Sequence, residues 1–280
     1  MLSYRHGFHA GNHADVLKHC ILVAVLDYLK QKPAPVSHVD THAGAGSYDL
    51  TSEFAQKNRE FATGVGRLWS IPTPPAPVAR YLARVRRRNP DGELKCYPGS
   101  PWLARDCLGP EDRLILFERH GREAEALRAH CAHDARVQVR EEDGFRGCLG
   151  VLPPPSRRGF MLMDPAYELK SDYEQVVRTL AGAVRRFATG TFALWYPVVD
   201  RRRVDRLLEA LVATGIRRID RFELGVRPDS EVHGMTASGM VVINPPYTLR
   251  GDMALALPFL ADVCGDHRQG FWTCEPLVGE

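Results

Sequence analysis

Apolar and polar residues alternate with two different periods along this chain, and each period predicts a different element. From Val16 to Leu29 the apolar residues recur at helical spacing, with Asn12 placed to cap the helix and Asp15 in its first turn. Residues 36–40 then indicate a short strand. A glycine-rich turn at 40–46 follows this strand directly.

Strand-like runs and amphipathic segments alternate again from residue 113 onwards. The predicted strands are 113–118, 137–140, 159–163, 191–196, 217–226 and 239–243, and the predicted helices are 123–130, 172–187 and 201–213. Strands that alternate with helices indicate an α/β fold with a mostly parallel sheet covered on both faces. The last two strands follow each other without a helix, so we expect a hairpin that makes the terminal strand antiparallel.

Residues 47–107 interrupt this alternation. They contain a proline-rich stretch at 72–77 and a basic helical stretch at 80–88. A chain of 280 residues is long enough for one large domain that carries an insertion. We therefore expect one domain over residues 1–280, with an inserted helical subdomain at 47–107.

The composition is that of an ordinary globular protein, with 44% hydrophobic and 25% charged residues. No apolar run reaches the roughly 18 residues that a membrane span needs, and the polar N-terminus is unlike a signal peptide. The seven cysteines are scattered without a C-x-x-C pair, which favours reduced thiols over a cysteine-based zinc site. We therefore expect a cytoplasmic protein that does not enter the membrane.

The net charge of +3 is a weak signal, but only six of the 37 basic residues are lysine. Arginine binds phosphate with two parallel hydrogen bonds, so this bias suits a nucleic-acid partner. A genome that favours arginine codons explains the bias equally well. The clusters 80–88, 201–203 and 217–218 are therefore candidate phosphate contacts or solvated surfaces.

Four acidic residues end four successive predicted strands: Asp40, Glu118, Asp143 and Asp164. Ligands of parallel sheets bind at the carboxyl ends of the strands. At that edge Glu118 is placed to bind a ribose diol, and Asp143 with Gly144 to contact an adenine amino group. The four acids therefore indicate a nucleoside-bearing ligand.

The turn at 40–46 lets its backbone approach a ligand, because Gly44 and Gly46 lack a Cβ atom. It has neither the glycine spacing of a dinucleotide site nor the lysine of a P-loop. A plain tight turn is the alternative for so short a motif. With the acids, the turn indicates a nucleoside without a diphosphate, so S-adenosylmethionine fits this site and NAD fits poorly.

The run Asp164-Pro165-Ala166-Tyr167 follows the apolar strand 159–163 and carries the most specific chemistry. The Asp164 carboxylate and the Pro165 carbonyl can accept both N–H bonds of a planar amine, and Tyr167 can stack on the heterocycle. Methylation of adenine N6 needs this arrangement, because it localises the nitrogen lone pair and gives the released proton an acceptor. The alternative is a helix-capping Asp164 and a core Tyr167.

A second run, Asn244-Pro245-Pro246-Tyr247, matches the signature of amino-methyltransferases more literally. It follows the terminal strand, however, and an antiparallel strand points its carboxyl end to the opposite edge of the sheet. We therefore predict that residues 244–247 form a structural exit turn.

Several histidines lie close to the N-terminus. His9 and His13, four residues apart, could ligate a metal with Asp15 nearby. Amine methylation needs no metal, and the predicted helix begins only near His13, so we expect no metal site. The alternative is that this segment lies over the active site, where it brings ring and guanidinium groups to base and phosphate through Tyr4, Arg5 and His6.

Five strings of this sequence, at 4–6, 8–19, 40–46, 97–101 and 235–240, resemble one known family. The longest string, Phe8–His19, is highly specific, and the likeness runs from residue 1 to about 260. The chain resembles the bacterial 23S ribosomal RNA adenine-N6 methyltransferases of the RlmJ family. The resemblance implies a Rossmann-like class I methyltransferase fold with a small helical insertion.

The resemblance also implies S-adenosylmethionine as the methyl donor and 23S ribosomal RNA as the partner, and we expect a monomer. The residues implied at the cofactor are His19, His42, Ser100, Glu118, Asp143, Gly144 and Asp164, to which the turn adds Gly44. Asp164 is implied as the catalytic acceptor, next to Pro165 and Tyr167, and Tyr4 as a contact to RNA. This chain departs from the family at Ala166, where a second proline is usual.

Two other functions fit parts of the pattern. A DNA adenine-N6 methyltransferase would use the same motif, but the chain shows no target-recognition domain of the size that reading duplex DNA requires. A nucleic-acid-binding protein that no longer catalyses would explain Ala166, but the intact acids Asp40, Glu118, Asp143 and Asp164 favour a functional site.

Overall fold

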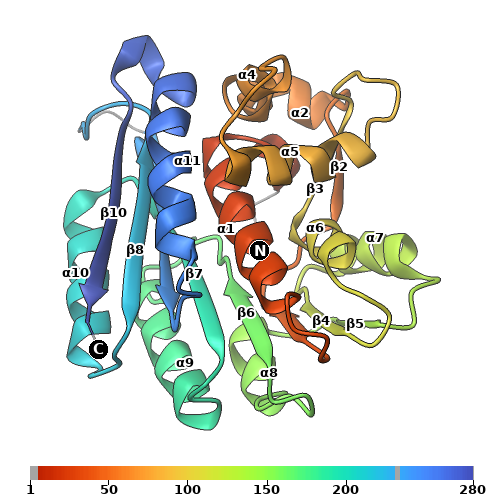
Figure 1. The fold of residues 1–280 in the computed structure, drawn as a ribbon, viewed down its shortest axis with the longest axis vertical. Coiled ribbons are helices and arrows are strands. Elements are labelled where there is room, and N and C mark those ends of the chain that lie inside the picture. The colour runs from red at the N-terminus through yellow and green to blue at the C-terminus, as the bar shows by residue number, and fades with distance from the viewer. Residues whose placement is uncertain (1–5, 231–233, 280) are drawn as a thin grey trace.

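The computed structural model describes residues 6–230 and 234–279, which form a three-layered α/β fold around an eight-stranded sheet (Figure 1). The strand order is β10-β8-β9-β7-β6-β1-β4-β5. The strands are β1 Ser37–Asp40, β4 Arg113–Phe117, β5 Val137–Arg140, β6 Gly159–Met163, β7 Thr191–Val198, β8 Ile219–Gly225, β9 Ala237–Ile243 and β10 Phe271–Val278.

The first five of these strands in the chain run parallel, and the expected antiparallel strand near the C-terminus is confirmed. β9 lies between β7 and β8 and is antiparallel to both. A second antiparallel strand, β10, pairs with β8 at the edge. The register places Asp40 beside Leu116 of β4 and Leu162 of β6. The chain therefore leaves β1, β4 and β6 at the same edge of the sheet.

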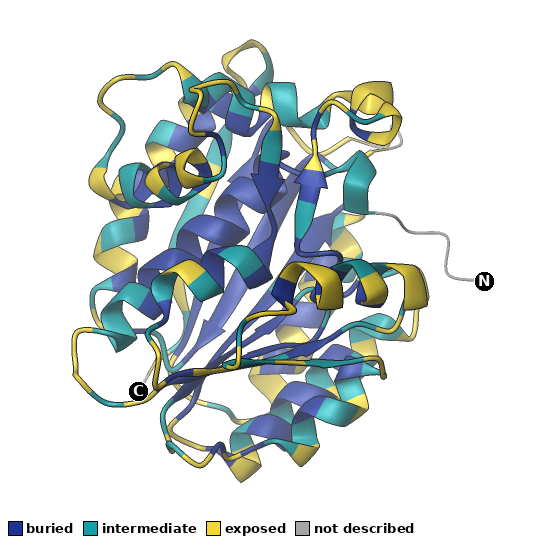
Figure 2. Ribbon diagram, turned by 90° about the vertical axis from the view of Figure 1, so that its right-hand side faces the viewer, coloured by how far each residue is buried: buried dark blue, intermediate teal, exposed yellow. Residues whose placement is uncertain are grey.

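Helices cover both faces of the sheet (Figure 1). On one face lie α1 His13–Leu29, α6 Ser100–Cys107, α7 Gly121–Cys131 and α11 Leu249–Cys264. On the other lie α8 Gly144–Gly150, α9 Asp172–Arg186 and α10 Arg201–Ala213. The central strands β1, β6, β7, β8 and β9 are almost entirely buried between these layers (Figure 2), whereas the edge strands β5 and β10 are partly exposed. None of the described helices is both long and apolar enough to cross a membrane.

The central helix α1 begins where its cap predicts. The Asn12 side chain accepts a hydrogen bond from Asp15 N at 3.0 Å, which satisfies a backbone donor of the first turn. Every residue from His13 to Leu26 is buried, including Asp15, Lys18 and His19. Three polar side chains inside a buried helix need specific partners, and these partners lie in the site described below.

The segment 47–107 combines helices with a two-stranded sheet. β2 Ser47–Asp49 pairs with β3 Cys96–Pro98, and between them lie α2 Glu53–Asn58, α3 Glu60–Thr63, α4 Val65–Trp69 and α5 Ala76–Arg87. α5 packs on α1 and α11, whereas α6 packs on α1 beside β1 and β4. Because α6 belongs to the layer that covers the main sheet, we propose that the inserted subdomain is 47–98.

Candidate active site

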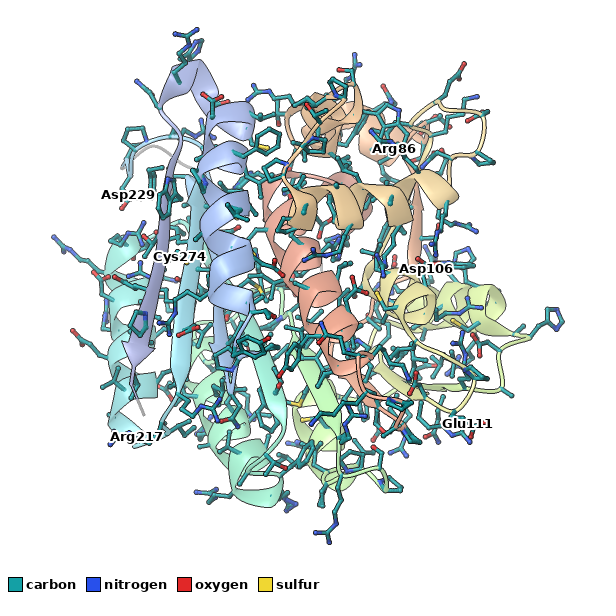
Figure 3. The ribbon with its side chains drawn as sticks, viewed as in Figure 1. Arg86, Asp106, Glu111, Arg217, Asp229 and Cys274 are labelled. Atoms are coloured by element: carbon teal, nitrogen blue, oxygen red, sulfur yellow. The ribbon has the colours of Figure 1, made fainter. Side chains whose placement is uncertain are left out.

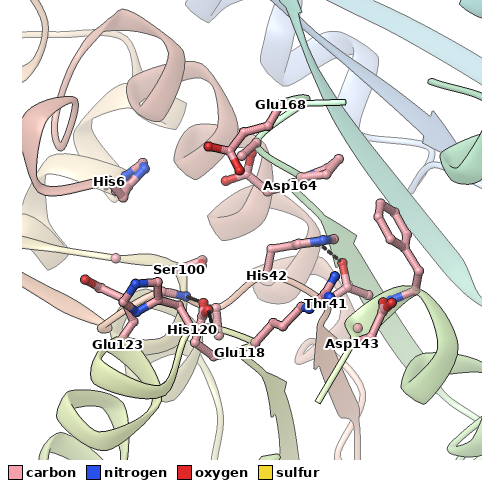
Figure 4. Close-up of a pocket in the computed structure, with 18 of the residues that line it drawn as sticks. His6, Thr41, His42, Ser100, Glu118, His120, Glu123, Asp143, Asp164 and Glu168 are labelled. Carbon is pink, nitrogen blue, oxygen red and sulfur yellow. Dashed lines mark hydrogen bonds between the residues drawn. The ribbon is translucent and has the colours of Figure 1, made fainter. Parts of the chain in front are cut away.

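A cavity lies at the carboxyl edge of β1, β4, β5 and β6, with α1 and the turn between β3 and α6 closing its side (Figure 4). Asp164 faces it from one side and Glu118 with His120 from the other. Its lining includes His6, Lys18, His19, His42, Gly44, Ser100, Glu118, His120, Asp143, Gly144, Asp164, Pro165 and Ala166. All eight residues that the sequence placed at a cofactor are therefore brought together here.

The turn after β1 is held by a hydrogen bond to Glu118 and depends on a glycine at position 44. Gly44 has φ +60°, and its N–H donates to Glu118 Oε2 at 2.8 Å. A Cβ atom at Gly44 would lie 2.3 Å from the Tyr48 hydroxyl oxygen, so only glycine fits without a shift. The turn thus presents bare backbone to the cavity.

Asp40 supports this turn from beneath and does not line the cavity. Its carboxylate accepts hydrogen bonds from Ser100 Oγ at 2.6 Å and from His42 N at 3.1 Å. Complete burial raises the pKa of Asp40 to about 6, although both hydrogen bonds favour the charged form. Asp40 therefore acts as a positioning residue for His42 and Ser100.

The acids after β4 and β5 keep acceptor oxygens at the cavity. Glu118 accepts from His120 N at 2.6 Å as well as from Gly44 N, and burial raises its pKa. Asp143 caps α8 by accepting from Phe145 N at 2.9 Å. A Cβ atom at Gly144 would lie 1.9 Å from the Thr41 carbonyl oxygen, so this glycine brings α8 against the turn after β1.

A buried chain of ionic contacts leads to Asp164. Its Oδ2 contacts the Lys18 ammonium, which also lies 2.8 Å from Asp15 Oδ1. Asp15 Oδ2 accepts from His6 Nε2 at 2.9 Å and from Gly11 N at 2.8 Å. Within the described residues, Oδ1 of Asp164 accepts no hydrogen bond and is left for a ligand.

The charged groups in this row of ionic contacts stabilise one another. Burial alone would raise the pKa of Asp15, but the charges of His6 and Lys18 hold it well below its ordinary value. Burial alone would lower the pKa of Lys18, but the two carboxylates raise it above the usual range. Lys18 therefore stays protonated and fixes the Asp164 carboxylate in one orientation.

Sequence reasoning missed Lys18 and His120, which both line the cavity. A signal for Lys18 was present, because it is a charged residue within the apolar stretch of α1. His120 follows Glu118 in a loop, where no periodic pattern marks it.

Tyr167 points away from the cavity in this structure. Its backbone has φ +52°, its hydroxyl donates to Trp195 O at 2.8 Å, and its ring lies 4.5 Å from that of Tyr173. Ala166 before it is exposed and lines the cavity. The Tyr167 ring therefore does not line the cavity in this structure and is not in position to stack on a base there.

Asn244 lies at the edge of the sheet opposite to Asp164, as the antiparallel direction of β9 predicts. It adopts φ +51°, and its side-chain amide donates to Ala188 O at 2.8 Å and Gly190 O at 2.9 Å. Both acceptors precede β7 at its amino end. Asn244 thus closes a structural turn.

The N-terminal segment docks on the insertion. His9 Nδ1 lies 2.8 Å from Glu60 Oε1, and Asn12 Nδ2 donates to Glu60 Oε2 at 3.0 Å. His13 is buried and its pKa is lowered to about 4 by that burial. The parts of the chain that the structure describes hold no group of three or more histidine, cysteine, aspartate or glutamate side chains arranged for a metal. Tyr4 and Arg5 lie outside the described residues.

The arginines of α5 contact neighbouring elements. Arg80 donates to Asp252 at 2.7 Å, Arg84 to Asp27 at 2.6 Å and Arg87 to Asp106 at 2.6 Å. The Arg86 guanidinium lies 5.3 Å from the Trp69 ring centre. Arg86 and Arg217 lie at opposite ends of the molecule (Figure 3). Most of this basic cluster therefore joins the insertion to the rest of the fold.

Comparison with known proteins decides the family. The family model described as "Ribosomal RNA large subunit methyltransferase D, RlmJ" matches residues 33–278. The chain belongs to the RlmJ family of methyltransferases. It is 47% identical, over the full length of both chains, to ribosomal RNA large subunit methyltransferase J of Haemophilus influenzae. It is 49% identical to the Escherichia coli protein of the same name, over 93% of each chain.

Solved structures support the fold of this RlmJ-family chain. A crystal structure of a Legionella pneumophila protein matches with a TM-score of 0.88 and 32% identity, over 96% of this chain and 98% of that one. A probable spermidine synthase from Corynebacterium glutamicum matches with a TM-score of 0.53 at 11% identity, over 93% and 75% of the two chains. The expected Rossmann-like class I methyltransferase fold is confirmed.

Proposed function

We propose that this protein transfers a methyl group from S-adenosylmethionine to the N6 amine of an adenine in 23S ribosomal RNA. The observation that carries the proposal is Asp164, which lies at the carboxyl end of β6 with one oxygen on Lys18 and the other open to the cavity. Both named relatives are ribosomal RNA large subunit methyltransferases. The proposal includes a monomer that works in the cytoplasm.

The cavity residues fit S-adenosylmethionine. Glu118 offers carboxylate oxygens to a ribose diol, and Asp143 offers an acceptor to an adenine amino group. His42 and Gly44 border the same space from the turn after β1, and His19 and Ser100 from its other side. When bound, this molecule supplies an electrophilic methyl group, so no metal is needed.

Asp164 and Pro165 would orient the acceptor amine. The carboxylate and the Pro165 carbonyl accept its two N–H bonds, which concentrates the lone pair on nitrogen in the direction of the methyl group. Asp164 then takes the proton that the nitrogen loses. Lys18 keeps the carboxylate in place, because its ammonium is fixed by Asp15 on the other side.

The N-terminal segment and Tyr167 would hold the RNA. His6 lines the cavity, as Lys18 does, so it can meet the nucleotide that carries the amine. The RNA contacts of Tyr4 and Arg5 are proposed from the sequence resemblance alone. Stacking of the base on Tyr167 requires that its ring turn from Tyr173 toward the cavity. Although Ala166 replaces the proline usual in the family, Asp164 and Pro165 are both present and both line the cavity.

Methyl transfer to 23S ribosomal RNA from cells that lack the enzyme tests this function. We expect wild type to methylate one adenine, and Asp164→Ala to lose at least about 100-fold in rate, because positioned proton acceptors contribute that much. Asn244→Ala serves as the matched control and should lower thermal stability without this loss of rate.

Two outcomes would contradict the proposal. Transfer to duplex DNA in preference to RNA would identify a DNA methyltransferase, and binding of RNA without S-adenosylmethionine binding would identify a non-catalytic protein. Undiminished transfer by Asp164→Ala would overturn the role of Asp164 alone.

A further inference from the structure

Three fully buried side chains form a hydrogen-bonded row from the cavity into the insertion. His19 of α1 has Nδ1 2.8 Å from the Tyr97 hydroxyl, and this hydroxyl lies 2.9 Å from that of Tyr81. Tyr97 belongs to β3 and Tyr81 to α5, and each of the three is 0% exposed. His19 lines the cavity, so the row joins the proposed donor site to the inserted subdomain.

The hydroxyl protons of this row have one satisfied arrangement. Tyr81 has no hydrogen-bond partner except Tyr97 among the described residues, so its proton must point to the Tyr97 oxygen. The Tyr97 proton then points to His19 Nδ1, which acts as the acceptor. The reverse direction would leave the Tyr81 O–H buried without an acceptor, at the full desolvation cost of that donor.

This arrangement fixes the tautomer of His19. A neutral imidazole that accepts at Nδ1 carries its proton on Nε2. Burial lowers the pKa of His19 to about 3, so the ring is neutral at physiological pH. Nε2 is buried and has no hydrogen-bond partner within the described residues. An N–H donor without an acceptor, on a residue that lines the cavity, points to a ligand acceptor.

The position of His19 in the cavity indicates which part of S-adenosylmethionine it would contact. Glu118 and Asp143 occupy the side of the cavity assigned to the nucleoside, and Asp164 marks the methyl group. The amino-acid arm of S-adenosylmethionine is then left with the side formed by α1 and the start of α6. Gly99, the N-cap of α6, makes no side-chain cap, so the Ser100 and Trp102 N–H groups of the first turn also favour a carboxylate there, while Pro101 offers no N–H.

We propose that Tyr81 and Tyr97 are positioning residues that hold His19 as an Nε2–H donor to the carboxylate of S-adenosylmethionine. This inference rests on the proposed function, because it requires S-adenosylmethionine in the cavity. It makes the seating of α5, and thus of the insertion, part of donor recognition.

Calorimetric affinities for S-adenosylmethionine and for decarboxylated S-adenosylmethionine test the inference, because the two ligands differ only in the carboxylate. In wild type the carboxylate should strengthen binding at least about tenfold, as expected of a charge-assisted hydrogen bond. Tyr97→Phe should lose most of that preference, while its affinity for the decarboxylated ligand stays within about threefold. Tyr81→Phe should lose less, because Tyr97 can still donate to His19.

Two replacements of His19 distinguish the roles of its Nδ1 and Nε2 atoms. His19→Gln places an amide N–H₂ near the position of Nε2 and should keep part of the preference for the carboxylate. His19→Asn places its amide near Nδ1 and should lose the preference. Nitrogen-detected NMR of the histidine rings should show the proton of His19 on Nε2 in wild type and a mixture of tautomers in Tyr97→Phe.

Tyr196→Phe is the matched control, since Tyr196 is also fully buried and its hydroxyl donates to Glu223 Oε2 at 3.1 Å, away from the cavity. It should lower stability and leave the ligand preference unchanged. Equal weakening of both ligands by Tyr97→Phe, or a proton on Nδ1 in wild type, would overturn the inference. Absence of S-adenosylmethionine binding by wild type would instead overturn the proposed function.

Discussion

At the scale of single residues, the site depends on groups that touch backbone as much as on groups that face the cavity. Asp40 and Glu118 each hold backbone N–H groups of the turns beside them. The sequence identified both acids from their places at strand ends, but it could not tell which protein groups would donate to them. One donor to Glu118 is the N–H of Gly44, a residue in the left-handed conformation.

Gly44→Ala should therefore weaken donor binding and lower stability. The alanine would adopt φ +60° at a cost of about 1–2 kcal/mol, and its Cβ would displace the Tyr48 hydroxyl. Gly92→Ala is the matched control, because Gly92 has φ +84° and a Cβ there would meet open space, with no described atom beyond its chain neighbours within 4 Å. Denaturant unfolding should show a similar or smaller loss for Gly92→Ala. Titration with S-adenosylmethionine should show weaker binding for Gly44→Ala only, and equal affinities of the two variants would contradict this role of the turn.

At the scale of elements, periodicity located most of the sheet. The strands β5 and β6 and the helix α10 have the predicted bounds, and α1, β4, β7 and α9 differ by a few residues. The elements α8, α11 and β10 were not predicted. α8 is a glycine-containing helix of seven residues, α11 contains Pro258, and β10 is an edge strand with Pro276. Each of these carries residues that weaken the local signal, and tertiary packing decides its conformation.

Strand β1 carries a histidine that the sequence did not explain. His38 is fully buried, its ring stacks on that of Phe160 at 5.4 Å, and both its nitrogens lack a hydrogen-bond partner of good geometry among the described residues. Burial lowers its pKa to about 4, with the Phe160 backbone acting weakly in the other direction. Between pH 6.5 and about 4, His38 is therefore protonated in the unfolded chain and neutral in the folded chain.

His38→Leu should make the protein less sensitive to acid. The unfolded pKa is 6.5 and the folded pKa is about 4, so stability from this residue is fully present above pH 6.5 and is lost as the pH falls toward 4. Between pH 6.5 and pH 4 the wild type should lose about 3 kcal/mol of its free energy of unfolding through His38, and the variant should not have this loss. Denaturant unfolding at pH 7, 6, 5 and 4 measures the difference.

Comparing variant with wild type matters here because Asp40 acts in the opposite direction. Its raised pKa of about 6 means that the folded state binds a proton first, which adds stability as the pH falls. Asp40 and the other acidic residues contribute equally to the pH dependence of stability in the variant and in the wild type, so the difference between the two reports on His38. Parallel pH profiles for His38→Leu and wild type would show that His38 is not the group responsible.

At the scale of the whole molecule, strand order decided between the two candidate motifs, and it also divides the arginine clusters. The sequence could place Arg201–Arg203 after a parallel strand and Arg217–Arg218 before one, but not show which arginines are already paired. The structure pairs Arg84 of α5 with Asp27 of α1. Arg202 is exposed at the start of α10, at the same edge as Asp164, and Arg217 is exposed at the opposite edge.

Three single substitutions should therefore be distinguishable by their effects on RNA binding and on stability. Arg202→Ala should lower affinity for 23S ribosomal RNA and reduce the slope of log affinity against log salt by about one, because one phosphate contact is lost. Arg217→Ala should leave both quantities unchanged, because β8 directs that residue away from the cavity edge. Arg84→Ala should lower the free energy of unfolding, since it leaves Asp27 without its 2.6 Å partner, while the salt slope stays that of wild type. Filter binding at several salt concentrations, with denaturant unfolding of each variant, separates these outcomes. A reduced slope for Arg84→Ala with an unchanged slope for Arg202→Ala would move the RNA surface from the carboxyl edge of the sheet to the inserted subdomain.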